Sequence, residues 1–298
     1  MLVSMKEICK IAKENHFGVP ALGVNNEHNI RCAVEAAEEA KSPLIILVTY
    51  GAHPDWLYFC ETCNRIADQA SVPVATILDH GRDFNKCVWA IRGGLTDIMI
   101  DKSAEPYEVN AAEVKRVCEV AHEIGIGVEA ELGHVGSASN YEHDGHTAFT
   151  EPEAAVKFVE ETGVDYLAVA VGTAHGAYPK GMKPEIQFDL LKELAEKVSV
   201  PLVLHGGSGS GDENIAKACQ LGICKVNVAN DLYKGEIAAL RKANDAGVTE
   251  YAMYNNLSDG YKEVAKHYFN LCGCAGKADL YSYIKRPGLP MSGGMLLK

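Results

Sequence analysis

Short runs of apolar, often β-branched residues recur along the chain and alternate with longer segments in which apolar residues return at helical spacing. The eight runs span residues 21–26, 44–49, 74–80, 97–101, 127–132, 166–171, 202–206 and 225–229. Continuously apolar strands that alternate with amphipathic helices are typical of a parallel sheet covered by helices. Eight such units predict an α/β protein with a closed (β/α)8 TIM barrel over residues of about 20–245.

The segments outside the barrel are predicted to be helical. Residues 1–16 form an amphipathic pattern with charges of both signs, and residues from about 248 to 298 predict one further helix followed by an extension that contains Gly and Pro. This tail either contacts a neighbouring subunit or is a frayed terminus. No linker rich in Pro, Gly or Ser interrupts the chain, so we expect a single domain over residues 1–298.

Composition narrows the class of protein. The chain has 298 residues, of which 47% are hydrophobic and 23% charged, as in an ordinary globular protein. Its formal charge of −12 is spread along the predicted helices, which argues against nucleic-acid binding because a phosphate backbone needs a basic face. No apolar run approaches the ~20 residues of a membrane span, and the amphipathic start does not resemble a signal peptide. We therefore expect a cytoplasmic protein without membrane contact.

Ten cysteines are expected to be reduced thiols in that compartment. Cys60 and Cys63 form a C-x-x-C, and Cys272 and Cys274 a C-x-C, which raises the question of a zinc knuckle or a redox pair. Cys60 and Cys63 lie inside a helical pattern, where residues three apart share a face. A structural or incidental role is the favoured interpretation.

Polar side chains follow several of the predicted strands at their carboxyl ends, which is the active-site face of this architecture. The residues are Asp79, His80, Asp101, Glu129, Glu131, His175, His205 and Asn227. His80, His175 and His205 come from three different strand ends, and three imidazoles with an open position describe a catalytic zinc site. Asp79 is predicted to act as a general acid/base, or else to orient His80. Glu131 and Asp101 either hold an alternative metal position or pair with lysines of the barrel.

Glycine-rich turns follow the sixth and seventh strands. The second of them, HGGSGSG, runs directly into a helix that is predicted to begin near Asp212. Backbone N–H groups in such turns and at helix N-termini bind anions, and the last barrel loops are a frequent phosphate site. The sequence therefore predicts a phosphorylated ligand beside the metal.

Five motifs carry a resemblance to a known family. They are LDHG at 78–81, VEAELGHVGS at 128–137, AVGTAHG at 170–176, PLVLHGGSG at 201–209 and KVNVA at 225–229. In these residues the chain resembles the class II, zinc-dependent aldolases, and most closely their tagatose-bisphosphate and ketose-bisphosphate branch. The resemblance implies cleavage or condensation of a ketose mono- or bisphosphate through a metal-stabilised enediolate, giving dihydroxyacetone phosphate and an aldehyde.

The same resemblance assigns roles to residues of this chain. It implies that His80, His175 and His205 bind one zinc ion per subunit, with Glu131 and Asp101 near an alternative metal position, and that Asp79 is the acid/base. Asn227 would hold the enediolate, and the phosphate pocket would be formed by Gly176, Gly206, Gly207, Ser208 and Asn230. It further implies a homodimer or homotetramer, and a monovalent cation such as Na⁺ or K⁺ near the phosphate.

The chain departs from the family's pattern at several positions. These are Gly23 in place of an asparagine that contacts substrate, Ile77 in place of a histidine, Asn230 in place of a threonine, Pro179 in place of a lysine, and Ser139 in place of an acid. Because the loop 137–149 is rearranged, we expect Glu142 to return the proton, with His143 and Asp144 as alternatives. Two other functions stay open: a metal-dependent sugar-phosphate-binding protein without efficient turnover, and a lyase or isomerase that stops at the enediolate.

Overall fold

Eight parallel strands close into a barrel in which each strand pairs with the next along the chain and the last pairs with the first. The computed structural model describes residues 1–138, 149–176, 178–179 and 184–282. The strands are β1 Val19–Val24, β2 Leu44–Thr49, β3 Val74–Gly81, β4 Asp97–Ile100, β5 Gly127–Leu132, β6 Tyr166–Val169, β7 Leu202–Leu204 and β8 Ile223–Val228. The predicted TIM barrel is confirmed.

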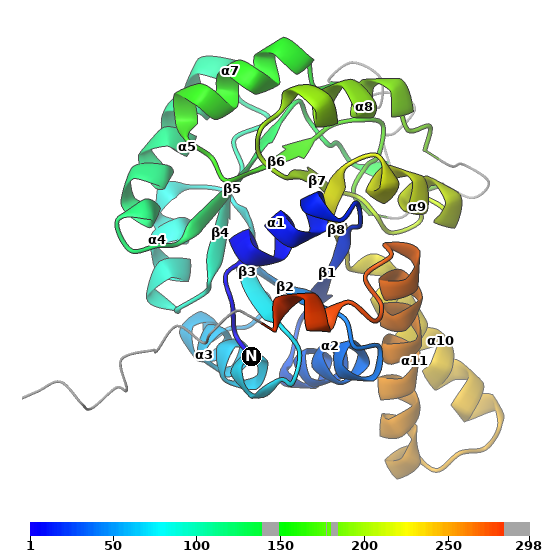
Figure 1. Cartoon of the computed structure of the whole chain (residues 1–298). Helices are drawn as coiled ribbons and strands as arrows, with labels where there is room; N and C mark the ends of the chain where they lie inside the picture. The colour runs from blue at the N-terminus through cyan, green and yellow to red at the C-terminus, as the bar shows by residue number, and fades with distance from the viewer. Residues whose placement is uncertain (139–148, 177, 180–183, 283–298) are drawn as a thin grey trace, which may run out of the picture.

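Helices surround the barrel and extend beyond it (Figure 1). They are α1 Met5–Glu14, α2 Glu27–Glu39, α3 Trp56–Gln69, α4 Phe84–Arg92, α5 Tyr107–His122, α7 Pro152–Thr162, α8 Phe188–Lys197, α9 Asp212–Gln220, α10 Asn230–Asp245, α11 Glu250–Leu271 and the 3₁₀ helix η2 Ala278–Tyr281. Helix α9 begins at Asp212, where the glycine-rich turn predicted a start. None of the described helices is both long enough and apolar enough to cross a membrane.

Helix α1 lies across the amino-terminal end of the barrel (Figure 1). Ser4 caps it by accepting a hydrogen bond from the Lys6 amide. The Met5 amide and the Tyr166 hydroxyl both donate to the buried Asp97 carboxylate, at 2.7 and 2.8 Å. Burial raises the pKa of Asp97 to about 7 despite these bonds. With this end of the barrel covered, ligands reach the interior from the carboxyl ends of the strands.

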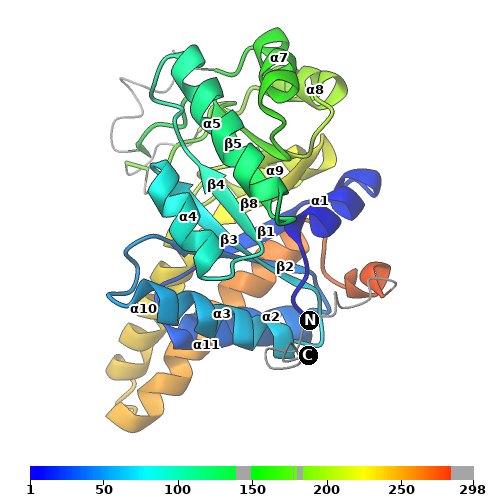
Figure 2. The same cartoon turned by 90° about the vertical axis from the view of Figure 1, so that its left-hand side faces the viewer.

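Helices α10 and α11 pack against each other and against β1, and the ends at which they are connected extend beyond the barrel (Figures 1 and 2). Their contact is close because both carry a glycine at it: a Cβ on Gly235 would lie 2.7 Å from the Gly260 carbonyl oxygen. Helix α11 also packs on α2, which ties the pair to the first strand–helix unit. The predicted tail helix is thus confirmed.

The ten cysteines are all free and buried. Burial raises the pKa of Cys60 to about 12, so the thiol stays protonated at neutral pH. Cys60 and Cys63 lie on the buried face of α3. This placement is that of packing residues.

Candidate metal centre

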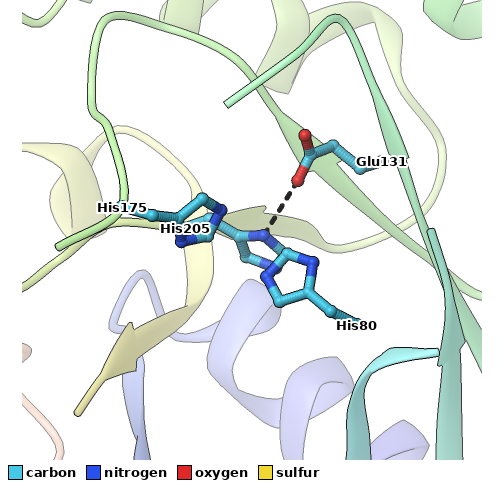
Figure 3. A group of neighbouring side chains, drawn as sticks. All are labelled: His80, Glu131, His175 and His205. Atoms are coloured by element: carbon cyan, nitrogen blue, oxygen red, sulfur yellow. Dashed lines mark ion pairs between the residues drawn. The ribbon is translucent and has the colours of Figure 1, made fainter. Parts of the chain in front are cut away.

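Three histidines and one glutamate converge at the carboxyl end of the barrel (Figure 3). His80 belongs to β3, Glu131 to β5, His175 to the segment after β6, and His205 directly follows β7. One nitrogen or oxygen atom from each lies within 4.8 Å of the corresponding atoms of the others. The His80 ring centroid is 4.7 Å from those of both His175 and His205. Residues far apart in sequence therefore form one cluster, as the strand-end pattern predicted.

An irregularity in β3 brings Asp79 and His80 to the same site. The register between β3 and β4 shifts between Leu78 and Gly81, and His80 has a φ of 49°, in the left-handed region. Successive side chains of a regular strand face opposite sides, whereas a bulge re-aims one of them. The unusual backbone at His80, which costs on the order of 1–3 kcal/mol, thus places two adjacent polar residues at the site.

Asp101 orients the His80 ring. Its Oδ2 atom lies 2.6 Å from His80 Nδ1, while its Oδ1 accepts from the Ser103 amide and hydroxyl. With Nδ1 engaged, Nε2 of His80 is the atom left to bind a metal. Burial opposes charge on this ring, but the charge of Asp79 and the bond to Asp101 raise the pKa of His80 overall.

His205 is fully buried, and the ion pair of Glu129 and Lys225 holds its ring in place. Its Nε2 lies 2.9 Å from Glu129 Oε1, and Glu129 in turn accepts two bonds from Lys225 Nζ, at 2.8 and 3.0 Å. Burial lowers the pKa of His205, yet the bond to Glu129 and the nearby Glu131 carboxylate raise it to about 9. Lys225 and His205 hold the pKa of Glu129 down to about 2, against its burial. This arrangement presents Nδ1 of His205 to the cluster.

The hydrogen bonding of two buried polar atoms in the cluster indicates whether a metal ion fits there. His205 Nδ1 and Glu131 Oε2 lie 2.9 Å apart, but neither has a hydrogen-bond partner of acceptable geometry among the described residues. Most buried polar atoms are hydrogen-bonded, so two buried atoms that meet only as an ion pair, without a hydrogen bond, are suited to bind a ligand instead. A set of imidazoles and a carboxylate is the donor set that zinc prefers. The four residues therefore fit a zinc ion.

The segment that carries His175 is fastened to the neighbouring loop. The His175 amide donates to the Gly136 carbonyl at 2.8 Å, and the Ala138 amide donates to the His175 carbonyl at 2.7 Å. Burial and the two neighbouring histidines lower the pKa of His175 to about 4. The ring is therefore neutral at physiological pH, which is the form that binds metals.

Asp79 lies beside the cluster in a polar setting. Its Oδ1 accepts from Asn227 Nδ2 at 3.1 Å and is 3.9 Å from His80 Nε2, while Oδ2 is 3.5 Å from Thr49 Oγ1. Asp101, not Asp79, makes the short bond to the His80 ring. The geometry thus leaves Asp79 available to a ligand at the metal.

A cavity of about 280 Å³ opens on one side of the histidines. It is lined by Leu47, Asp79, His80, His175, Gly176, Gly206, Ser208, Asn227, Val228, Ala229, Asn230 and Tyr233. Five of the six predicted phosphate and substrate residues border it. The sixth, Gly207, lies behind the wall, where a Cβ would be 2.6 Å from Val226 Cγ1.

Polar groups in the wall of this cavity suit an anion. Helix α10 begins at Asn230, and its N-cap, Ala229, offers no side-chain acceptor to the first N–H groups. The buried Asn230 Nδ2, a donor, has no partner among the described residues. The turn at Gly206 packs closely on the segment before His175. Gly206 has a φ of 67°, and a Cβ at this position would lie 2.4 Å from the Ala174 carbonyl oxygen. A helix N-terminus with spare donors is a ready anion site.

A second cavity, of about 720 Å³, lies on the other side of His80 and His175. It is lined by Thr49, Tyr50, His80, Arg82, Asp83, Lys86, Asp101, Lys102, Ser103, Ala104, Glu105, His134, Val135 and His175. The histidines thus stand between a small cavity with anion-binding features and a larger polar one.

Some predicted residues fall outside the described part of the chain, and some important ones were not predicted. Glu142, His143, Asp144 and Ser139 lie outside the described residues. Sequence reasoning gave no role to Lys225, although a lysine in the middle of an apolar strand, two residues before Asn227, was the available signal. Tyr233 was also missed, because nothing in a helical segment marks one tyrosine as facing a cavity.

Comparisons with known proteins agree with this geometry. Residues 3–277 match the family described as class-II fructose-bisphosphate aldolase. A fructose-bisphosphate aldolase of Thermus caldophilus is 38% identical, over 93% of this chain and all of the relative. The crystal structure of the YdjI aldolase of Escherichia coli K12 has a TM-score of 0.83 at 35% identity, over 93% of this chain and all of that one. A fructose-bisphosphate aldolase structure from Campylobacter jejuni, at 22% identity, covers 93% of this chain and 97% of its own and shares the fold with a TM-score of 0.78.

Proposed function

Because the chain belongs to the class-II fructose-bisphosphate aldolase family, we propose that it is a zinc-dependent aldolase that cleaves or condenses a ketose mono- or bisphosphate. The products of cleavage are dihydroxyacetone phosphate and an aldehyde. The observation that carries the proposal is the cluster of His80, His175, His205 and Glu131 next to Asp79, in which His205 Nδ1 and Glu131 Oε2 are buried without a hydrogen bond. The cluster borders a cavity with spare donors for a phosphate.

Cleavage of the bond between C3 and C4 leaves an electron pair on C3, next to the C2 carbonyl. Zinc bound by the three histidines would act as a Lewis acid that lowers the energy of this charge by several kcal/mol. Asp79 takes the proton from the C4 hydroxyl as C4 becomes the aldehyde carbon, and returns it in condensation. Asn227 holds the Asp79 carboxylate at 3.1 Å and so fixes its direction.

The two cavities accommodate the two halves of the substrate. The phosphate of the dihydroxyacetone half occupies the smaller one, against Gly176, Gly206, Ser208 and the start of α10 at Asn230. The aldehyde half begins at C4, beside Asp79 at the edge of the smaller cavity, and the rest of it extends into the larger one. Glu142 is the candidate for the group that protonates C3 after cleavage.

The test combines metal analysis with a coupled assay for triose phosphate over a panel of ketose mono- and bisphosphates. We expect about one zinc per chain, lost in His205→Ala together with activity. Asp79→Asn should keep the zinc and lose about 10²- to 10⁴-fold in kcat. Asp245→Asn, an exposed change at the end of α10, is the matched control.

One result separates this proposal from its alternatives. A zinc-loaded protein that binds ketose phosphates but releases no triose phosphate from any of them would be a binding protein rather than an aldolase. Exchange of solvent protons into dihydroxyacetone phosphate without cleavage of any ketose phosphate would indicate a lyase or isomerase that stops at the enediolate.

A further inference from the structure

The wall of the smaller cavity is built unusually where β1 and α10 meet. Gly23 of β1 faces Ala229 and Tyr233, which both line the cavity. A Cβ on Gly23 would lie 2.7 Å from the Ala229 Cβ and 3.2 Å from the Tyr233 hydroxyl oxygen. Any side chain at position 23 would therefore enter space that the Tyr233 hydroxyl and Ala229 already fill. Position 23 has no side chain with which to contact a substrate, and Tyr233 brings a hydroxyl to the same place.

The surroundings fix where this hydroxyl lies. Tyr233 is in the first turn of α10, and its amide donates to the Ala229 carbonyl at 3.3 Å. On the other side, the Tyr261 hydroxyl donates to the Gly23 carbonyl at 3.0 Å and holds β1 in place. Glu236, one turn along α10 from Leu232, is bonded to Asn29 at 2.6 Å, which ties α10 to α2. The tyrosine is thus carried by a helix that is anchored at several points.

The Tyr233 hydroxyl is a spare donor. The side chain is half-buried, and its hydroxyl has no hydrogen-bond partner among the described residues. Burial, with the charges of Glu236 and Asp79, raises its pKa well above the ordinary value, so the proton stays on the oxygen. A donor that borders a cavity and lacks a protein partner is suited to a ligand oxygen.

Resting on the aldolase function proposed above, we infer that Tyr233 is a specificity-determining residue whose hydroxyl donates a hydrogen bond to the C4 hydroxyl oxygen of the ketose phosphate. The C4 hydroxyl is the group that Asp79 deprotonates, and Asp79 and Tyr233 share the cavity wall. A rigidly held donor meets the C4 oxygen in only one of the two C4 configurations. Tyr233 therefore selects between substrates that are epimers at C4.

The experiment compares Tyr233 with Tyr233→Phe, which removes one oxygen and keeps the ring, on D-fructose and D-tagatose phosphates, which differ at C4. A neutral hydrogen bond to substrate corresponds to about a three- to tenfold loss of kcat/KM for the preferred epimer. The other epimer should change by less than about twofold, so the ratio between them shrinks, with zinc content unchanged. Tyr251→Phe, at a tyrosine that is 90% exposed, is the control.

A purely structural role of Tyr233 would lower kcat/KM for both epimers alike, and that result, or no change, overturns the inference. The same pair of variants in an Asp79→Asn background gives binding constants for both epimers by calorimetry without turnover. If the native chain cleaves neither epimer but its binding preference depends on Tyr233, the aldolase function fails and the inference stands. If the native chain cleaves the epimers and Tyr233→Phe does not alter its preference between them, the inference about Tyr233 fails while the aldolase function stands. Absence of both cleavage and binding overturns both.

Discussion

Replacing Lys225 by methionine should destabilise the protein far more than replacing a surface lysine. Lys225 and Glu129 are both fully buried, and two contacts of 2.8 and 3.0 Å join them. Methionine matches the length of the lysine stem but takes the ammonium group from the Glu129 carboxylate, which keeps only the His205 ring as a partner among the described residues. Removing one partner of a buried pair costs about 3–5 kcal/mol, because the remaining buried charge loses most of its compensation. We expect a loss of that size in the free energy of unfolding.

The assay is urea unfolding of chelator-treated protein, so that metal binding does not contribute. Lys192→Met is the matched control, since Lys192 pairs with Glu196 at 3.9 Å on the exposed face of α8. Its loss should stay below about 0.5 kcal/mol. The double variant Lys225→Met/Glu129→Gln removes both charges and should recover about 2 kcal/mol relative to Lys225→Met. The reasoning is refuted if Lys225→Met costs less than about 1 kcal/mol, or if the double variant is no more stable than the single one.

Three further outcomes follow from the site. Because the folded pKa of His205 is raised to about 9, the chelator-treated protein should lose on the order of 3 kcal/mol of stability as pH rises from about 6.5 to 9. The slope should become clearly smaller in His205→Ala, where the raised pKa of His80 still contributes in this range. Gly206→Ala would put a Cβ 2.4 Å from the Ala174 carbonyl oxygen, and should abolish binding of inorganic phosphate measured by calorimetry, whereas unchanged affinity contradicts that assignment. Asp101→Ala should weaken zinc affinity by about 10- to 100-fold in a chelator competition, because His80 loses the partner that orients it, and an unaltered affinity would remove that role.

The fold and the cluster were predictable because strand ends in a parallel barrel share one rim. His205 follows one apolar run and His80 ends another. Once the runs are assigned to the strands of a barrel, the two histidines are expected at the same end of it. The predicted sixth run extended to Val171, but β6 ends at Val169 because the Ala170 amide donates to the Thr150 hydroxyl at 2.8 Å. That bond joins residues 20 positions apart, so no local sequence pattern predicts it.

Finer features of the site depend on how the strands pair with each other, and the sequence alone does not predict them. The bulge that aligns Asp79 with His80 appears only in the pairing of β3 with β4. The contact from His205 through Glu129 to Lys225 joins three strands, and its direction decides which ring nitrogen of His205 faces the cluster. Gly207 shares a turn with Gly206 and Ser208, yet only those two border the cavity.

The placement of His80 and His175 between two separate cavities has a consequence for how such an enzyme diversifies. One cavity is walled mainly by the segments after β6, β7 and β8, and the other mainly by those after β2, β3, β4 and β5. If the proposed function holds, mutations in the second group alter the carbonyl compound that is accepted and leave the site of the phosphorylated nucleophile unchanged. Under the proposed function, a gene copy could therefore acquire a new acceptor by changes at Tyr50, Lys86 and Lys102, and a directed-evolution library confined to these three positions would sample new carbon chains while it leaves His80 and Asp101 unchanged.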